Sequence, residues 1–293
     1  MAEENAPSSE TLALPLEQLG GLLDAVSYAA VMLDREGRVM YVNRAGRRLV
    51  GRRGEELCGR DAEEAIPEIC GKAFSGVRRE RGLGGAASQF EEYYGPREMW
   101  TEVNVCPAPG GVLVCARDVT ARKAAERIAL AQMQVLEMMA CGAPLADVLR
   151  AITMMVEQQS KGDVCSILRL DSDGKHLRRA ACGSLPDGYC QAIDGAEIGP
   201  AAGSCGTAAY TRVRVVVSDI ATDPKWEAYR ELALPHGLRA CWSQPIFSRD
   251  GGRVLGTVAN YSYRIREPAE RSLRLLETAA WLAQIAIERG SEC

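Results

Sequence analysis

The first part of the chain combines two patterns of hydrophobic positions. Apolar residues recur at helical spacing from Leu16 to Val26, and two β-prone runs in AAVMLDREGRVMYVN then flank DREG, which predicts a hairpin. RAGRRLVG predicts a short helix that ends at Gly51, and residues 54–79 predict short helices broken by Pro67. Three further strands are predicted in SQFEEYY, MWTEVNVCP and GVLVCARDVT. Together these elements predict one compact domain with about five antiparallel strands.

From Ala121 the hydrophobic period becomes helical, which predicts a helical linker over residues 121–140. Its seam advances by alternating steps of three and four residues and includes a polar glutamine: Ala125, Ile128, Gln132, Val135 and Met139. Such a heptad seam is typical of paired helices. Two interpretations stand equal: a contact between the helices of two chains, and an amphipathic helix that packs on its own domain.

The remaining chain predicts a second sheet with a helix at each end. APLADVLRAITMMVEQQS predicts the first helix, and VCSILRLDSDGKHLRRAAC predicts a hairpin with Asp-Gly as its turn. Strands are predicted in RVVVSDIA, ACWSQPIFS and RVLGTVANYSY, before the amphipathic helix PAERSLRLLETAAWLAQIAIERG. The predicted fold class is therefore α+β: two domains, residues 15–120 and 141–290, each an antiparallel β-sheet flanked by helices, joined by the helical linker. Residues 1–14 lack hydrophobic periodicity and are predicted to be disordered.

Composition and charge narrow the class of protein. Of the 293 residues, 47% are hydrophobic and 25% are charged, which is ordinary for a soluble globular protein. The net charge of −4 gives no electrostatic case for binding nucleic acid or an anionic membrane. The N-terminus does not resemble a signal peptide, and the longest apolar stretch, near TAAWLAQIAI, falls short of the ~20 residues of a membrane span. We expect a cytoplasmic protein, with neither nucleic acid nor a membrane as a partner.

Eleven cysteines are scattered along the chain, an odd number without a CxxC motif. In a cytoplasmic chain this pattern argues against a disulfide framework and favours cysteines buried as small apolar side chains. The chain has only two histidines, His176 and His236, and no spacing that matches a structural zinc site. We therefore expect no metal site.

The segment GSCGTAAY has several interpretations. Cys205 as a nucleophile needs a base within reach, and His236 is the only nearby candidate in the sequence. A phosphate-binding loop needs more glycines and a lysine, which the segment lacks. A tight turn needs only Gly203 for the reversal and Ser204 as the cap of a short helix. If that helix starts on a cavity wall, its N–H groups can hold a polar or anionic ligand, which makes Ser204, Cys205 and Thr207 candidate ligand-binding residues.

Two tryptophans are the other ligand-binding candidates. Trp242 alternates with Cys241 and Ser243 on a predicted strand, so one face of the strand should line a cavity and the other should pack under a helix. Trp100 holds the same position in the first domain. For both tryptophans, burial in a core is the competing interpretation. Asn43 ends a strand before a helix and is expected to be a cap or turn residue.

These stretches carry a resemblance to two families of sensory domains. AVMLDREGRVMYVNRAGRRLVG, FEEYYGPREMWTEVNVCPAPGGVLVCARDVT and DVTARKAAE make residues 17–120 similar to a PAS domain. CSILRLDSDG, GSCGTAAYTRVRVVVSDIATDPKWEAYRELALPHGLRACWSQPI and GRVLGTVANYSY make residues 135–290 similar to a GAF domain. Together the two resemblances cover nearly the whole chain and agree with the predicted pair of sheets.

The resemblance also implies a route for a signal. The PAS family closes its last strand with an Asp-x-Thr trio that starts a signalling helix, and Asp118 and Thr120 hold those places here, with Thr120 as the N-cap. Together with Ile128 and Val135 of the linker, these two residues form the predicted signal relay.

PAS and GAF domains in series imply the sensory input module of bacterial signalling proteins, where they usually precede a histidine kinase, a cyclic-dinucleotide enzyme or a DNA-binding region. The sequence shows no Gly-rich nucleotide loop and no phospho-acceptor histidine in a helix pair, so we expect no enzyme activity and no catalytic residues. We expect a homodimeric sensor that binds an unknown small-molecule ligand or cofactor and passes a conformational change to a downstream signalling protein.

Several alternatives to this sensor hypothesis stay open. The chain could be a redox sensor that uses Cys182, Cys190 and Cys205, or the input half of a longer sensor histidine kinase. It could also be an enzyme of the GAF fold with Cys205 as a thiol catalyst, like the small family that reduces methionine sulfoxide, or a scaffold with filled cores.

Overall fold

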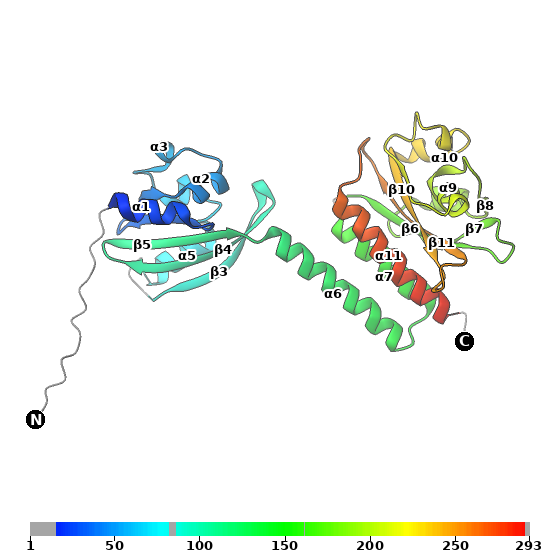
Figure 1. Cartoon of the computed structure of the whole chain (residues 1–293), viewed down its shortest axis with the longest axis horizontal. Coiled ribbons are helices and arrows are strands. Elements are labelled where there is room, and N and C mark those ends of the chain that lie inside the picture. Colours follow the sequence, from blue (N-terminus) through cyan, green and yellow to red (C-terminus); the bar gives the residue numbers. More distant parts are fainter. Residues whose placement is uncertain (1–15, 82–85, 161, 291–293) are drawn as a thin grey trace, which may run out of the picture. The chain divides into compact units, whose positions relative to one another are not determined.

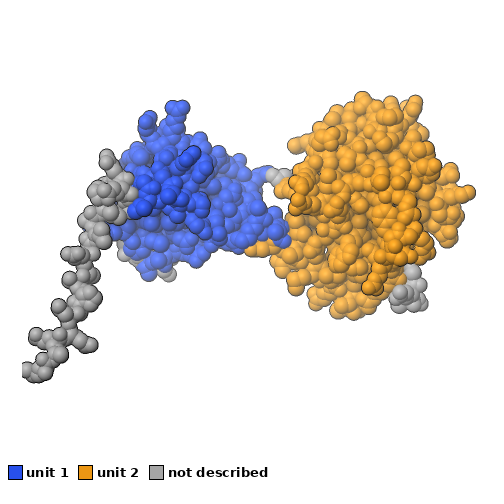
Figure 2. Space-filling view, in the orientation of Figure 1, with its two compact units in different colours: residues 1–125 blue, residues 126–293 orange. Residues whose placement is uncertain are grey.

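The computed structural model describes residues 16–81, 86–160 and 162–290, so the predicted disordered segment 1–14 lies outside the described residues. The chain divides into two compact units, residues 1–125 and 126–293 (Figure 2). Each unit contains one antiparallel sheet flanked by helices. The predicted α+β class with two such domains is confirmed.

The first unit has a five-stranded sheet in the order β2-β1-β5-β4-β3, antiparallel at every step (Figure 1). Its strands are β1 (Ala29–Asp34), β2 (Val39–Val42), β3 (Ser88–Tyr94), β4 (Met99–Ala108) and β5 (Gly111–Asp118). Its helices are α1 (Leu16–Ala25), α2 (Arg44–Val50), α3 (Gly54–Leu57), α4 (Ala62–Ala65), α5 (Lys72–Arg81) and the 3-10 turn η1 (Gly95–Arg97). The helical segment between β2 and β3 contributes the fully buried side chains of Leu57, Ile66 and Phe74 to a core shared with the sheet.

Asn43 joins β2 to α2 from a fully buried position. Its side-chain oxygen accepts hydrogen bonds from the backbone N–H groups of Ala30 (2.9 Å) and Gly46 (2.7 Å), and the second of these caps α2. Its side-chain amide donates to the carbonyls of Leu23 (2.7 Å) and Tyr28 (2.8 Å). The residue expected to be a cap therefore also connects α1, β1 and α2.

Helix α6 (Thr120–Ala140) begins beside the end of β5, and hydrogen bonds tie its start to β4. The Asp118 carboxylate accepts from the Thr120 backbone N–H (2.8 Å), while the Thr120 hydroxyl accepts from the Trp100 backbone N–H (2.8 Å). The prediction that Thr120 is the N-cap is wrong, because Thr120 is already helical and its hydroxyl is used by β4. The pair nevertheless fastens the last strands of the sheet to α6.

The second unit has a six-stranded sheet in the order β8-β7-β6-β11-β10-β9. Its strands are β6 (Val164–Leu170), β7 (His176–Ala181), β8 (Ala196–Glu197), β9 (Val215–Val217), β10 (Ala240–Phe247) and β11 (Val254–Ser262). Its helices are α7 (Leu145–Gln159), α8 (Asp187–Ala192), α9 (Gly203–Thr211), α10 (Arg230–Ala233) and α11 (Glu270–Arg289), with the 3-10 turns η2 (Pro224–Trp226) and η3 (Leu234–His236). Helices α7 and α11 cover one face of the sheet, and α9 covers the other (Figure 1).

The two faces of this second sheet carry separate clusters of buried side chains. Trp242 and Val258 lie in the cluster with α7 and α11, whereas Cys241, Ala259 and Tyr261 lie in the cluster with α9. Successive residues of a strand point to opposite faces, which explains why neighbours in sequence belong to different clusters. Strands β10 and β11 therefore contact both layers of the unit.

The second half of α6 packs on the layer formed by α7 and α11. Val135 and Met139 are buried in that cluster, and Ile128 packs against it. For these residues the structure supports the interpretation in which the seam packs on its own domain. A different face of α6 stays exposed, with Leu130 at 60% and Met133 at 64% of their full accessibility.

Candidate ligand site

The second unit contains a small cavity of about 30 Å³ between α9 and the sheet. Several elements of the unit form its walls. The lining residues include Tyr189 of α8, Ser204 and Cys205 of α9, Trp226 of η2 and Tyr261 of β11. A buried water needs roughly 10–15 Å³, so the cavity in this conformation has room for a molecule of only a few atoms. Its walls are mostly aromatic and apolar, with a thiol and hydroxyls among them.

The start of α9 lies on the cavity wall, as one interpretation of GSCGTAAY predicted. Gly203 has a φ of 62°, the left-handed conformation that glycine allows at the entry to the helix. Ser204 does not cap the helix, which corrects the prediction. Its hydroxyl donates to the Cys241 carbonyl (3.2 Å) and accepts from the Trp226 indole N–H (3.0 Å), so it joins α9, β10 and η2.

Cys205 is the thiol of the cavity wall, and a tyrosine hydroxyl lies beside its sulfur. The Tyr261 hydroxyl lies 3.6 Å from the sulfur, and Tyr261 itself accepts from the Ser166 hydroxyl (3.5 Å). A hydrogen bond from the Cys241 thiol lowers the pKa of Cys205 to about 6, against the opposing effect of burial, and the hydroxyls of Tyr261 and Ser243 also lower it. The thiol is thus placed among groups that stabilise its anionic form.

Three other predicted site residues lie away from the cavity. The Thr207 hydroxyl is buried and accepts from the Ala202 backbone N–H (3.1 Å), so it holds the turn before α9. Trp242 is fully buried on the opposite face of the sheet, where the Arg266 guanidinium lies 4.9 Å from its ring centroid. Trp100 packs against Tyr93 at 5.5 Å between ring centroids, near Lys123, so it lines no core of the first unit.

His236, the histidine nearest to GSCGTAAY in the sequence, does not form the predicted nucleophile–base pair with Cys205. The His236 ring packs edge-on against the Tyr189 ring, with 6.1 Å between the centroids. Two other candidate redox cysteines do lie together: a hydrogen bond between the thiols lowers the pKa of Cys190 and raises that of Cys182. The structure thus brings the cysteines into two groups, Cys205 with Cys241 and Cys182 with Cys190.

The cavity includes aromatic residues that the sequence did not single out as ligand contacts. These residues are Tyr189, Trp226 and Tyr261, and each lies on a different element from Cys205. The rings of Tyr189 and Tyr261 contact each other edge-on, with 5.6 Å between their centroids. Only the packing of α8 and η2 against β11 brings them together. The position of Trp226, a large aromatic residue between two predicted strands, was the one available signal in the sequence.

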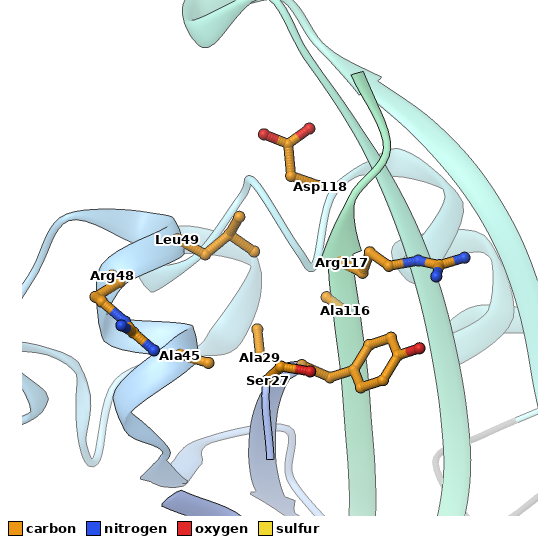
Figure 3. A pocket seen from close by; sticks show the side chains of 9 residues that line it. Ser27, Ala29, Ala45, Arg48, Leu49, Ala116, Arg117 and Asp118 are labelled. Atoms are coloured by element: carbon orange, nitrogen blue, oxygen red, sulfur yellow. The ribbon is translucent and has the colours of Figure 1, made fainter. Parts of the chain in front are cut away.

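The first unit has a different kind of hollow, a groove of about 540 Å³ beside β1, β5 and α2 (Figure 3). Arg48 extends from α2 on one side, and Arg117 and Asp118 lie on the other, at the end of β5 (Figure 3). The Arg117 guanidinium lies 5.6 Å from the Tyr28 ring centroid. Asp118, predicted to relay a signal, therefore also borders this groove.

Two further findings concern the described part of the chain. Within it, no helix is long and apolar enough to cross a membrane. The same residues contain no group of three or more His, Cys, Asp or Glu side chains that could hold a metal ion.

The fold defines a chain of two antiparallel-sheet domains, the second of which has a cavity under a helix. Residues 142–288 match the GAF domain family, and residues 23–124 match the PAS fold. The chain belongs to the GAF domain family and carries a PAS domain before its GAF domain, as the resemblance implied. It is a PAS–GAF sensor chain, and its two units are called the PAS unit and the GAF unit below.

Comparison with known proteins gives a relative that is itself a sensor. The methyl sulfide methyltransferase-associated sensor of Methanosarcina acetivorans is 44% identical over 171 residues, which are 58% of this chain but 17% of that protein. The GAF domain of an Acinetobacter phosphoenolpyruvate-protein phosphotransferase aligns at 15% identity and a TM-score of 0.46, covering 56% of this chain and 95% of that one. The free methionine-R-sulfoxide reductase of Neisseria meningitidis aligns at 21% identity and 0.44, covering 58% and 93%. The chain thus corresponds to a small part of the curated relative.

Proposed function

We propose that this chain is a non-catalytic input module in which the GAF cavity holds a small ligand and the sheet passes its effect to the helices α7, α11 and α6. The observation that carries the proposal is the placement of β10 and β11. Their side chains reach the cavity cluster on one face and the helical cluster on the other. A ligand that favours one packing of the α9 side therefore also favours one packing of the helical side.

Two adjacent residues of β10 form a direct connection between the layers. The Cys241 carbonyl accepts the hydrogen bond from Ser204 at the cavity wall, and Trp242 follows it on the helical face. A shift of α9 pulls on this part of β10 and changes how the Trp242 ring packs against α7 and α11. The coupling free energy expected for such a device is about 1–3 kcal/mol, enough to shift a two-state population.

The output of the module is a downstream partner in this proposal. The curated relative is named a sensor, and this chain matches 17% of it, which supports a role as the sensing part of a signalling system. We propose that this partner belongs to a two-component pathway, in which a sensor changes the activity of a kinase. The ten described cysteines are free thiols. This supports the proposal that the protein functions in a reducing compartment such as the cytoplasm.

A second copy of this chain is the first partner in the proposal. Val135 and Met139 are used within the GAF unit, so the face of α6 left for a second chain is the one with Leu130, Met133 and Leu136. These side chains follow each other at steps of three, which places them along one side of the helix. A contact through α6 puts the proposed dimer interface beside the helical layer that responds to the cavity.

Native mass spectrometry of the freshly purified chain tests the proposal. We expect a mass of two chains with an additional small species, lost when Ala196→Leu extends a side chain from the cavity wall. Ala192→Leu is the matched control, because Ala192 is exposed at the end of the neighbouring α8. A bare wild-type chain, or a bound species that survives Ala196→Leu, would count against the cavity. A single-chain mass would contradict the dimer.

A further inference from the structure

Two buried hydroxyl groups on the α9 side of the GAF sheet lack hydrogen-bond partners among the described residues. Ser243 on β10 and Thr257 on β11 are both fully buried, and neither hydroxyl has a partner. They lie on the face of the sheet that also carries Cys241 and Tyr261. A buried hydroxyl without a partner costs about 1–3 kcal/mol, so their placement calls for an acceptor.

An acceptor on this side of the sheet is the sulfur of Cys205, which packs in the same buried cluster as Cys241 and Tyr261. Both hydroxyls act on Cys205 in the direction that stabilises its thiolate, although they lie beyond ordinary hydrogen-bond reach in this conformation. The Tyr261 hydroxyl accepts from Ser166, which leaves its own proton available for the sulfur 3.6 Å away. The Tyr261 hydroxyl is therefore a donor beside the sulfur, and a neutral thiol is a poor acceptor for it.

The position of Cys205 in α9 favours the same charge state. Cys205 lies in the first turn of this nine-residue helix, where Gly206 is the first residue to donate a backbone hydrogen bond back to Ala202 (3.1 Å). The N–H groups at a helix start stabilise a negative charge nearby. Ionisable groups on other elements that interact with Cys205 are Cys165, Cys241, Tyr261 and Tyr189, and burial raises the pKa of each of these.

We propose that Cys205 is a thiolate modification site that reacts with hydrogen peroxide entering the GAF cavity and thereby regulates the module. The inference rests on the proposed role of that cavity as the place where a signal acts. Peroxide has two heavy atoms and suits a cavity of about 30 Å³. The neighbouring aromatic side chains of Tyr189 and Trp226 leave little room for a larger electrophile.

The reaction balances with peroxide as the oxidant. The Cys205 sulfur attacks one peroxide oxygen, an S–O bond forms and the O–O bond breaks. The sulfur loses two electrons to the peroxide, and the leaving hydroxide takes a proton from solvent and departs as water. The product is a sulfenic acid, which adds an oxygen atom between α9 and the sheet. That added volume pushes on the same connection from α9 to β10 that a bound ligand would use.

The test is a peroxide titration of the folded whole chain with peptide-level mass analysis. After each dose the peroxide is removed and the chain is unfolded in the presence of dimedone, because a cavity of about 30 Å³ does not admit dimedone to the folded protein. We expect the adduct on Cys205 to form at lower peroxide doses than on Cys58 and Cys141, which are the exposed cysteines among the described residues and serve as internal references. Cys241→Ser keeps a hydroxyl donor in place and prevents loss of the adduct through a Cys205–Cys241 disulfide. Adducts on Cys58 and Cys141 with Cys205 unmodified, in wild type and in this variant, would overturn the inference.

A second variant separates the chemistry from the stability of the fold. Ser243→Ala combined with Thr257→Val removes two hydroxyls that have no other partner, so the unit should keep its melting temperature. We expect Cys205 to react about tenfold more slowly at about pH 5, since below the pKa a rise of one unit lowers the thiolate fraction about tenfold. An unchanged rate in the folded variant would overturn the role of the hydroxyls. If Cys205 is inert while native mass spectra still show a cavity-dependent ligand, the inference fails and the proposed function stands.

Discussion

Replacing Trp242 with alanine is expected to lower the free energy of unfolding of the GAF unit by about 3–5 kcal/mol. Trp242 is the largest fully buried side chain of the described residues, and it packs in the cluster formed by α7, α11 and the second half of α6. The substitution removes this packing and leaves a hollow in the middle of the helical layer. The Arg266 guanidinium also loses the ring that it covers.

Trp242→Phe is the matched control for this prediction. The indole N–H of Trp242 has no hydrogen-bond partner among the described residues, so phenylalanine loses part of the packing but no buried hydrogen bond. Urea unfolding followed by circular dichroism should show a large loss for alanine and a smaller one for phenylalanine. Equal losses for the two variants would mean that the ring is not the centre of this core. The PAS unit has its own core and should keep its transition.

Asn43→Ala is expected to destabilise the PAS unit by about 3 kcal/mol or more. The side chain makes four hydrogen bonds of 2.7–2.9 Å to backbone groups of α1, β1 and α2, and it is fully buried. Alanine removes the helix cap and leaves these backbone groups to compete for water at a buried position. The loss should exceed that of an ordinary helix cap, because the side chain fastens three elements.

The control for Asn43→Ala is Asn104→Ala, on the half-buried outer side of β4. The two variants remove the same chemical group from one unit, so denaturant unfolding of each compares an amide that joins elements with one that does not. We expect a change within about 0.5 kcal/mol for Asn104→Ala. Similar losses for the two would contradict the account of Asn43 as the junction of the PAS unit.

Most elements of the fold could be predicted because their signals are local. The alternation of apolar residues found the strands, and Gly51 marked the end of α2, where it adopts the left-handed conformation as a C-cap. Asn43 was recognised as a cap from its place between a strand and a helix. Its bonds to Leu23 and Tyr28 could not be predicted, because they depend on how α1 packs against β1.

The candidate site was predicted only in part, for a physical reason. Ser204 and Cys205 stood out because small residues surround them, and both do line the cavity. The face on which Trp242 lies depends on strand register, since a shift of one residue exchanges the two faces, and the sequence alone left that register open. The hydroxyl of Thr120 accepts a hydrogen bond from the backbone N–H of Trp100, twenty residues earlier. The sequence could not predict this bond, because it depends on how the start of α6 lies against β4.

The central claim is that the GAF sheet couples the cavity to the helical layer, and hydrogen exchange on Ala196→Leu tests it most directly. Filling the cavity imitates a bound ligand without requiring its identity, and Ala192→Leu supplies the matched reference. The account predicts altered amide protection in α9 and β10 and also across the sheet in α7 and α11. A change confined to α8 and α9, with α7 and α11 protected as in wild type, would contradict the coupling.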